Sequence, residues 1–98
     1  MSIVCGHRGA CGYAPENTFA AFKLALEQGA KWIEFDVQLS RDGVPVILHD
    51  DTLERTTDRG GPRAPAELSL SELKELDAGS WFSQDYAGER IPTLDEVL

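Results

Sequence analysis

The chain has 98 residues, of which 42% are hydrophobic and 27% charged, the balance of a small globular domain. Only nine basic residues stand against 17 acidic ones, so a nucleic-acid-binding surface is not expected. The sequence has no run of 18 apolar residues and no basic N-terminal segment, so we expect neither a membrane anchor nor a secretory signal. With only Cys5 and Cys11 as cysteines, this favours a reduced protein in the cytoplasm over a disulfide-bonded one.

The first third of the chain predicts a strand, a loop and a helix. Residues 3–5 are apolar and form a short buried strand that Gly6 is expected to end. The next residues include several glycines and a proline, which is typical of a loop whose backbone comes close to another group. A helix is expected to follow, capped by Asn17 or Thr18 and ended by Gly29.

The clearest strand pattern covers residues 31–39, where apolar and polar side chains alternate. The apolar side chains of that stretch should share one face and pack on helices. They are Ile33, Phe35, Val37 and Leu39. Asp42-Gly43 predicts a hairpin turn, and residues 44–48 a second strand. Pro45 places that second strand at an edge or outside the main sheet.

The remainder of the chain predicts a polar loop and two helices. Residues 51–65 contain no periodic apolar pattern and read as a long loop. Ser69 and Glu72 form a possible capping box for a helix that should end at Gly79, and Thr93 begins another helix close to the last residue. The order of elements is that of an α/β protein, and we expect the chain to be part of a longer one.

Two carboxylates in the alternating strand are candidates for a metal site. Glu34 and Asp36 are two residues apart and should project to the same face, roughly 7 Å apart by strand rise. Two neighbouring carboxylates in a poorly solvated place need a cation, and hard oxygen ligands suit Mg²⁺ or Ca²⁺. The alternative is the solvated face of an ordinary strand.

The position of His49 depends on the length of the hairpin loop. A two-residue turn places His49 opposite Asp36, and a four-residue loop places it opposite Glu34. A three-residue loop would turn His49 away from the carboxylates. A histidine beside two acids could also form no more than a surface ion pair.

His7 and Arg8 follow the first strand. In α/β folds, loops at the carboxyl ends of strands build the active site. His7 offers a proton-transfer group near neutral pH, and Arg8 a planar guanidinium that suits a phosphate. A lone His-Arg pair is also common in solvated loops, so the interpretation depends on its combination with the other residues.

Together these residues resemble the glycerophosphodiester phosphodiesterase family. The resemblance lies in the order and spacing of Gly6-His7-Arg8-Gly9, Ala14-Pro15-Glu16-Asn17-Thr18, Glu34-x-Asp36 and Leu48-His49-Asp50, with further similarity in residues 52–57 and 77–94. It covers the whole chain. Any one of these motifs is weak alone, but their arrangement is specific.

The resemblance implies an N-terminal fragment of a (β/α)8 TIM-type barrel with a β-hairpin after the second strand, so that residues 1–98 are a partial domain. It implies a metal-dependent hydrolase that converts glycerophosphodiesters, its small-molecule substrates, to glycerol 3-phosphate and an alcohol. By the same resemblance His7 is the general base, His49 the general acid, Arg8 a phosphate contact, and Glu34 and Asp36 ligands of Mg²⁺ or Ca²⁺. The family's third metal carboxylate has no counterpart in the chain.

Two alternatives remain at this point. One is phospholipase-D-like chemistry on lipids by the same kind of site. The other is an inactive module that binds a phosphate ligand. The alcohol group, the metal and the oligomeric state are not fixed by the sequence.

Overall fold

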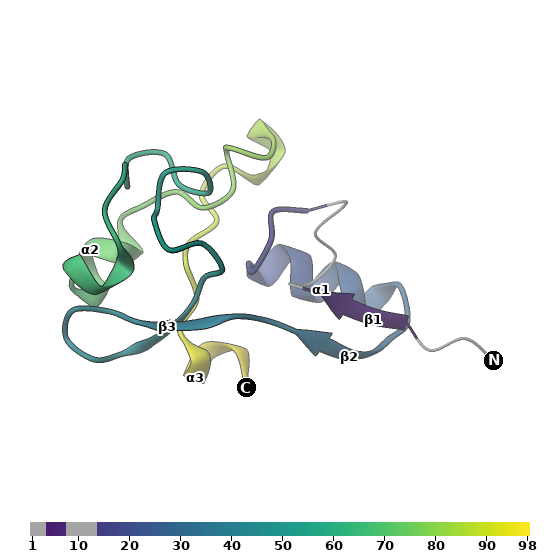
Figure 1. Cartoon of the computed structure of the whole chain (residues 1–98). Coiled ribbons are helices and arrows are strands. Elements are labelled where there is room, and N and C mark those ends of the chain that lie inside the picture. The colour runs from purple at the N-terminus through teal and green to yellow at the C-terminus, as the bar shows by residue number, and fades with distance from the viewer. Residues whose placement is uncertain (1–3, 8–13) are drawn as a thin grey trace.

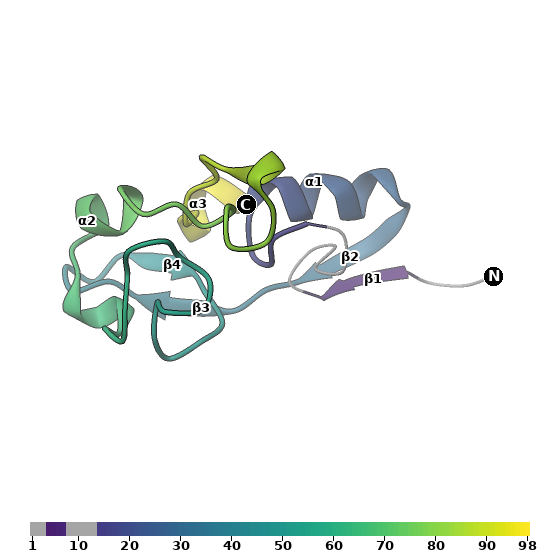
Figure 2. The same ribbon diagram turned by 90° about the horizontal axis from the view of Figure 1, so that it is seen from above.

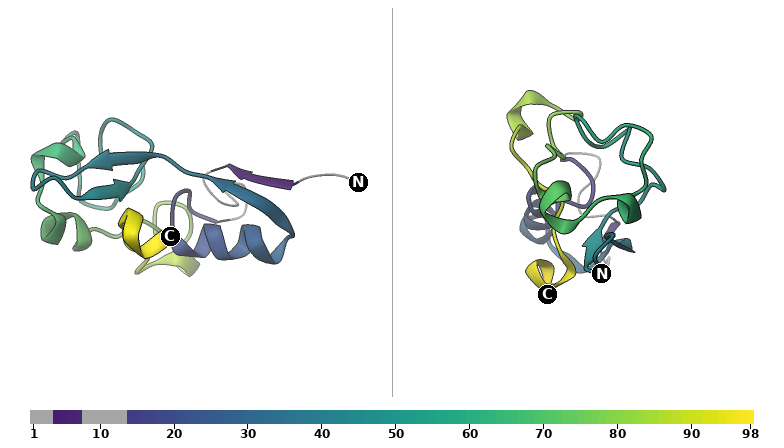
Figure 3. Two further views of the ribbon diagram at one scale, coloured as in Figure 1. Left: turned by 90° about the horizontal axis from the view of Figure 1, so that it is seen from below. Right: turned by 90° about the vertical axis from the view of Figure 1, so that its left-hand side faces the viewer.

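The computed structural model is an elongated α/β structure, 44 × 28 × 19 Å along its principal axes (Figure 3). It describes residues 4–7 and 14–98, with residues 4–7 and 30–33 described by their backbone. The strands and helices in chain order are β1 (Val4–His7), α1 (Phe19–Glu27), β2 (Ala30–Glu34), β3 (Val37–Leu39), β4 (Pro45–Ile47), α2 (Leu70–Lys74) and α3 (Leu94–Val97). Two short 3-10 turns, η1 (Pro65–Glu67) and η2 (Gln84–Tyr86), lie between the helices. No helix among the described residues has both the length and the apolar character needed to cross a bilayer.

One half of the structure is a βαβ unit, in which β1 and β2 are parallel neighbours and α1 packs beside them (Figure 1). Thr18 is the N-cap, because its side chain accepts a hydrogen bond from the backbone N–H of Ala21. The helix ends as expected just before Gly29, whose φ of 88° favours glycine. Phe22 of α1 is buried and meets Phe35 edge-to-face, with ring centroids 6.0 Å apart.

Two strand predictions need correction. Strand β1 does not stop at Gly6 but continues to His7, because Gly6 and His7 both pair with β2. The predicted strand 31–39 is two strands interrupted at residues 35–36. Its first part bonds to β1 and its second part to β4, so the chain passes from one two-stranded sheet into another. The alternation of apolar and polar residues in the sequence continues through residues 35–36, so this pattern could not predict the break.

The other half begins with the predicted hairpin, whose register differs from both of the favoured ones (Figure 2). Val37 pairs with Ile47 and Leu39 with Pro45, which leaves a three-residue loop, residues 41–43. The Gly43 N–H donates to the Ser40 carbonyl, and Gly43 has a φ of 80°. The loop is therefore a β-turn closed by an i to i+3 hydrogen bond, with a left-handed glycine at its last position, rather than a two-residue turn. The placement of the Pro45 strand outside the parallel sheet is confirmed.

A single apolar core supports the hairpin half. Its members come from β4, from the predicted loop and from α2 and the segment beyond it: Val46, Leu48, Leu53, Leu68, Leu73, Leu76, Ala78 and Ile91. Residues 51–65 contain no strand or α-helix, as predicted, but they are not a loose loop. Leu53 is fully buried, and a Cβ built on Gly60 would lie 2.2 Å from the Leu53 Cβ. Leu53 and Gly60 therefore anchor the segment in the core, although other residues of the segment are exposed.

The two C-terminal helix starts are confirmed and one helix end is wrong. Ser69 with Glu72, and Thr93 with Glu96, form the predicted capping boxes of α2 and α3. However, α2 ends at Lys74 rather than near Gly79. Gly79 has a packing role instead, since an added Cβ would lie 2.0 Å from a backbone carbonyl oxygen.

The predicted apolar face of residues 33–39 is buried only in part. Phe35 packs on α1, but Val37 is 46% exposed and Leu39 is 55% exposed. The expectation that the whole face packs on helices is therefore wrong for these two side chains within this chain, because β3 lies beyond the reach of α1.

Candidate functional site

The parallel pairing brings two of the predicted site residues to one edge of the sheet. His7 is the last residue of β1, and its register partner on β2 is Glu34, the last residue of that strand. Neighbouring strands are about 4.8 Å apart, so the two Cα atoms lie close together at the carboxyl edge. Glu34 is exposed and Phe35 packs on α1, as side-chain alternation predicts. Arg8 and Cys11 lie outside the described residues, and of His7 and Cys5 only the backbone is described.

The Asp36 side chain and backbone have two separate partners. Its carboxylate oxygen Oδ2 accepts a hydrogen bond from Asn17 Nδ2 at 3.2 Å. Its backbone carbonyl accepts the N–H of Leu48 at 2.9 Å. Since Leu48 directly precedes His49, this second bond fixes the end of β4 beside the end of β2. The residue pair Asn17 and Leu48 therefore holds Asp36 from both sides.

His49 faces a carboxylate that belongs to the next residue along the chain. His49 Nδ1 lies 2.8 Å from Asp50 Oδ1. An ionised carboxylate can only accept, so Nδ1 carries the hydrogen and Nε2 is left to act on another molecule. The His49 side chain is 39% exposed. The turn is tethered by Gln38, whose Nε2 donates to the Asp50 carbonyl at 2.7 Å.

Arg55 holds Asp50 and a second carboxylate together. Its Nε donates to Asp50 Oδ2 at 2.8 Å, and its Nη2 donates to Asp50 Oδ1 and to Glu16 Oε2, each at 2.9 Å. The guanidinium lies over the Trp81 ring, 5.5 Å from its centroid. The hydrogen bonds from Arg55 keep the pKa of the Asp50 carboxyl well below its usual range. Asp50 is therefore a carboxylate at any pH near neutrality.

The side chains of Glu16, His49 and Asp50 meet the spacing of a metal site. Their ligand atoms all lie within 4.8 Å of one another. However, Arg55 already donates to both carboxylates of this cluster, and a cation bound there would compete with the guanidinium. Glu34 and Asp36 offer two hard oxygen donors at the ends of the paired strands, a donor set that suits Mg²⁺ or Ca²⁺. The oxygen-donor chemistry of that pair therefore fits a divalent cation better than the cluster around Arg55 does.

Neither of the two hairpin registers expected to place His49 opposite Glu34 or Asp36 is present. A three-residue loop gives the register that turns His49 away from the Glu34 and Asp36 face if the pairing were extended. The strand is interrupted at residues 35–36, however, and His49 lies beyond the last residue of β4. The backbone bond from Leu48 to Asp36 continues the β3–β4 register by one pair, and it places the backbone of His49 directly after this contact.

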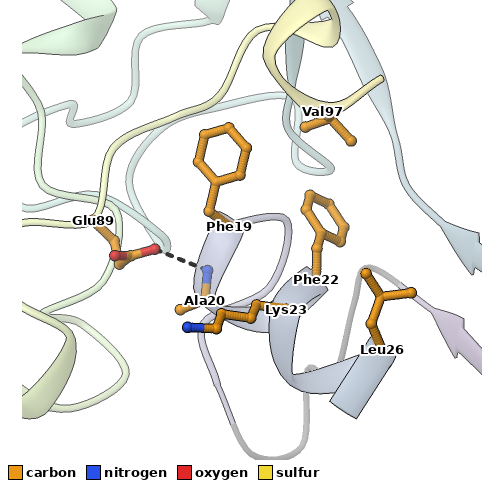
Figure 4. Close-up of a pocket in the computed structure, with 7 residues that line it drawn as sticks. All are labelled: Phe19, Ala20, Phe22, Lys23, Leu26, Glu89 and Val97. Carbon is orange, nitrogen blue, oxygen red and sulfur yellow. Dashed lines mark hydrogen bonds between the residues drawn. The ribbon is translucent and has the colours of Figure 1, made fainter. Parts of the chain in front are cut away.

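Two hollows of similar volume lie on the described part of the surface, and one of these two contains a predicted site residue. A hollow of about 520 Å³ is formed by His49, Asp50, Asp51 and Thr52. The other, of about 540 Å³, is an apolar groove between α1 and α3 (Figure 4). Phe19, Phe22 and Leu26 line the groove, and Glu89 reaches into its edge to accept the Ala20 N–H at 3.1 Å. The groove contains none of the predicted site residues.

Sequence reasoning assigned no role to several residues that the structure places around the site. Glu16, Arg55 and Trp81 belong only to the stretches that carry the family resemblance, and Asn17 was expected only as a possible helix cap. In the structure, Asn17 is the described residue other than glycine that has a positive φ, 55°, at the position next to the helix cap. Arg55 gives no signal in the local sequence, since its partner Glu16 is 39 residues away.

Comparison with known proteins identifies the family. The profile of the glycerophosphoryl diester phosphodiesterase family matches residues 7–98. The chain belongs to this family. A glycerophosphodiester phosphodiesterase of Caldanaerobacter subterraneus is 52% identical over 97 residues, which are 99% of this chain and 39% of that protein. The chain thus spans about two fifths of the length of the curated relatives it matches.

Solved structures of family members match the fold closely. The glycerophosphodiester phosphodiesterase of Agrobacterium tumefaciens gives a TM-score of 0.93 at 50% identity, covering 100% of this chain and 42% of that one. A phosphodiesterase of Oleispira antarctica, in complex with the product sn-glycerol-3-phosphate, gives 0.91 at 56% identity and covers 98% of this chain and 38% of that one. The predicted fold class is confirmed: the chain is an α/β portion of a TIM-type barrel with a hairpin after the second strand.

Proposed function

We propose that the chain is the N-terminal part of a metal-dependent phosphodiesterase that hydrolyses glycerophosphodiesters to glycerol 3-phosphate and an alcohol. In this proposal residues 1–98 are a partial domain, and the complete active site needs residues beyond them. The observation that carries the proposal is the arrangement of His49. Its Nδ1 is held by Asp50, and it follows directly on the residue bonded to Asp36. The relative crystallised with sn-glycerol-3-phosphate supports the substrate class.

The histidines have complementary roles in the proposal. His7, beside Glu34, removes a proton from the attacking hydroxyl, which belongs to water or to the glycerol part of the substrate. Attack by water gives glycerol 3-phosphate directly, whereas attack by the glycerol hydroxyl gives a cyclic phosphodiester that water must then open. His49 donates a proton from Nε2 to the leaving alkoxide oxygen as the phosphorus–oxygen bond breaks. Such transfers typically contribute about 10²–10⁴-fold each. Arg8 contacts a non-bridging phosphoryl oxygen through its guanidinium.

Glu34 and Asp36 would hold the divalent cation, Mg²⁺ or Ca²⁺. When bound, the cation supplies stabilisation of the negative charge on the phosphoryl oxygens. The protein's own contribution is to fix Asp36 through Asn17 and Leu48. The substrate is a small molecule, and the cytoplasmic location suggested by the cysteine usage stays a prediction.

The test uses the full-length protein that carries residues 1–98, assayed on glycerophosphocholine with Mg²⁺ or Ca²⁺ and scored by release of glycerol 3-phosphate. His49→Ala and His7→Ala should each lower kcat at least about 100-fold. Arg41→Lys is the control, because Arg41 pairs with Glu72 on the surface, far along the hairpin. Wild-type activity without any divalent cation, or unchanged activity in the two histidine variants, would contradict the proposal.

A further inference from the structure

Arg55 donates several hydrogen bonds to carboxylates beside His49, although its own side chain lies partly in solvent. Three hydrogen bonds link its guanidinium to Asp50 and Glu16, which lie on separate segments of the chain. Both oxygens of Asp50 accept from it, so the carboxylate is held in a bidentate fork. The Arg55 side chain is 46% exposed, but Glu16 is 8% exposed and Asp50 24% exposed. The carboxylates are thus the buried partners.

The bidentate fork fixes the plane of the Asp50 carboxylate. Among the described residues, the Asp50 carboxylate has one other side-chain partner, the imidazole of His49, whose Nδ1 lies 2.8 Å from the same Oδ1 that accepts from Arg55. If the Asp50 carboxylate rotated about its side-chain torsions, its hydrogen bond to His49 Nδ1 would move the imidazole as well. The Trp81 ring beneath the guanidinium limits the movement of Arg55 itself.

We propose that Arg55 is a positioning residue that acts through Asp50 to aim Nε2 of His49 at the leaving oxygen of the substrate. Arg55 does not touch the substrate in this scheme, and Glu16 and Trp81 hold its guanidinium in place. The inference rests on the proposed role of His49 as general acid. A misplacement of about 1 Å in such a group can cost about 10²-fold in rate, so the effect should be measurable.

Turnover of two substrates with different leaving groups distinguishes a positioning role of Arg55 from a merely structural one. Glycerophosphocholine releases an alkoxide that must be protonated, whereas a glycerophospho-4-nitrophenyl ester releases a stable phenolate that needs no acid. Arg55→Lys keeps the positive charge but cannot form the fork. In the full-length protein with its divalent cation, it should lower kcat on glycerophosphocholine by about 10–100-fold and leave KM nearly unchanged. The loss on the nitrophenyl ester should be under about threefold.

Two further variants establish that Arg55 acts through Asp50. Asp50→Asn should show the same dependence on the leaving group, and the double variant should lose no more than the worse single one. Arg41→Lys is the matched control, the same change in an arginine that also pairs with a carboxylate at 2.9 Å. Thermal unfolding of each variant shows whether the fold is kept.

Each outcome decides the inference. Equal losses on both substrates, or fully additive losses in the double variant, would overturn it, whatever the thermal stability. His49→Ala serves as the reference. If His49→Ala shows the leaving-group dependence and Arg55→Lys does not, only the role of Arg55 is wrong. If His49→Ala shows no loss on glycerophosphocholine, the proposed function itself is wrong.

Discussion

The carboxamide of Asn17 donates through Nδ2 to Asp36 Oδ2 at 3.2 Å, from a residue that is 3% exposed and has a φ of 55°. A residue other than glycine loses about 1–2 kcal/mol of conformational free energy in this backbone conformation. The buried amide thus stands at a strained position beside one of the proposed metal ligands.

This relationship predicts different effects for two substitutions of Asn17. Asn17→Gly removes the amide and accepts the positive φ, so it should weaken Ca²⁺ or Mg²⁺ binding by about tenfold with little backbone strain. Asn17→Ala should weaken binding equally and, in addition, lower the free energy of unfolding by about 1 kcal/mol more. Calorimetric titration with the metal alone and urea unfolding measure the two effects. Unchanged metal affinity in both variants would show that Asn17 does not support Asp36.

Thr56 and Thr57 allow a comparison of how a buried hydroxyl with and without hydrogen-bond partners affects the free energy of unfolding. Among the described protein atoms, Thr56 Oγ1 has no hydrogen-bond partner, whereas Thr57 Oγ1 donates to the Leu53 carbonyl at 2.5 Å and accepts the Gly60 N–H at 3.0 Å. Thr57→Val should therefore lower the free energy of unfolding by about 1–3 kcal/mol. Thr56→Val should change it by less than about 1 kcal/mol. Equal losses in urea unfolding would contradict this account.

Gly60 and Gly61 separate packing from backbone strain. A Cβ at Gly60 would lie 2.2 Å from the Leu53 Cβ, whereas a Cβ at Gly61 would meet no atom within 4 Å but would sit at a φ of 61°. Gly60→Ala should destabilise the fold by about 3 kcal/mol through overpacking, and Gly61→Ala by about 1 kcal/mol through strain. Thermal unfolding of both variants gives the comparison. A larger loss at Gly61 would mean that the packing of the 51–65 segment is misjudged.

Asp77 makes stability depend on pH. Burial raises the pKa of its carboxyl. Hydrogen bonds from the backbone N–H groups of Ser80, Gly79 and Gly88 together outweigh burial and lower the pKa to about 2. Because the folded pKa lies below the unfolded value of about 3.9, this stabilisation is present above pH 4 and is lost as the pH falls toward 2. Asp77→Asn should lower the free energy of unfolding by about 1–3 kcal/mol at pH 7.

The loss in Asp77→Asn should shrink as the pH falls toward 2, where the wild-type carboxyl is about half protonated in the folded state and almost fully protonated in the unfolded state. Glu54→Gln is the control, because Glu54 is exposed. Urea unfolding at pH 7, 4 and 2 provides the measurement. A difference between Asp77→Asn and wild type that is the same at all three pH values would contradict the assigned cause.

The apolar surface predicts the behaviour of residues 1–98 expressed alone. Leu26 is 62% exposed, and Val37 and Leu39 are about half exposed, although they belong to elements that a complete barrel would cover. We expect this piece to be at best marginally stable, to bind a hydrophobic dye and to lack phosphodiesterase activity. A cooperative transition above about 50 °C together with turnover that His49→Ala abolishes would contradict this expectation.

The sequence by itself determined those features that depend on neighbouring residues. The caps at Thr18, Ser69 and Thr93 follow from side chains that reach backbone groups two or three residues away, and all three are present. The βαβ order and the family resemblance likewise follow from local patterns and their order along the chain.

Only the tertiary structure decided the remainder, because those features depend on contacts between distant segments. The hairpin register depends on the length of the loop. The loop differs by one residue from both expected lengths, and this difference reverses the side of the strand to which His49 was predicted to point. The break at residues 35–36 arises because β2 and β3 bond to different partners. Arg55 meets Glu16 across 39 residues, a distance at which sequence periodicity carries no information. The positions of His49 and Asp36 are set by these long-range bonds rather than by the local patterns of their own strands.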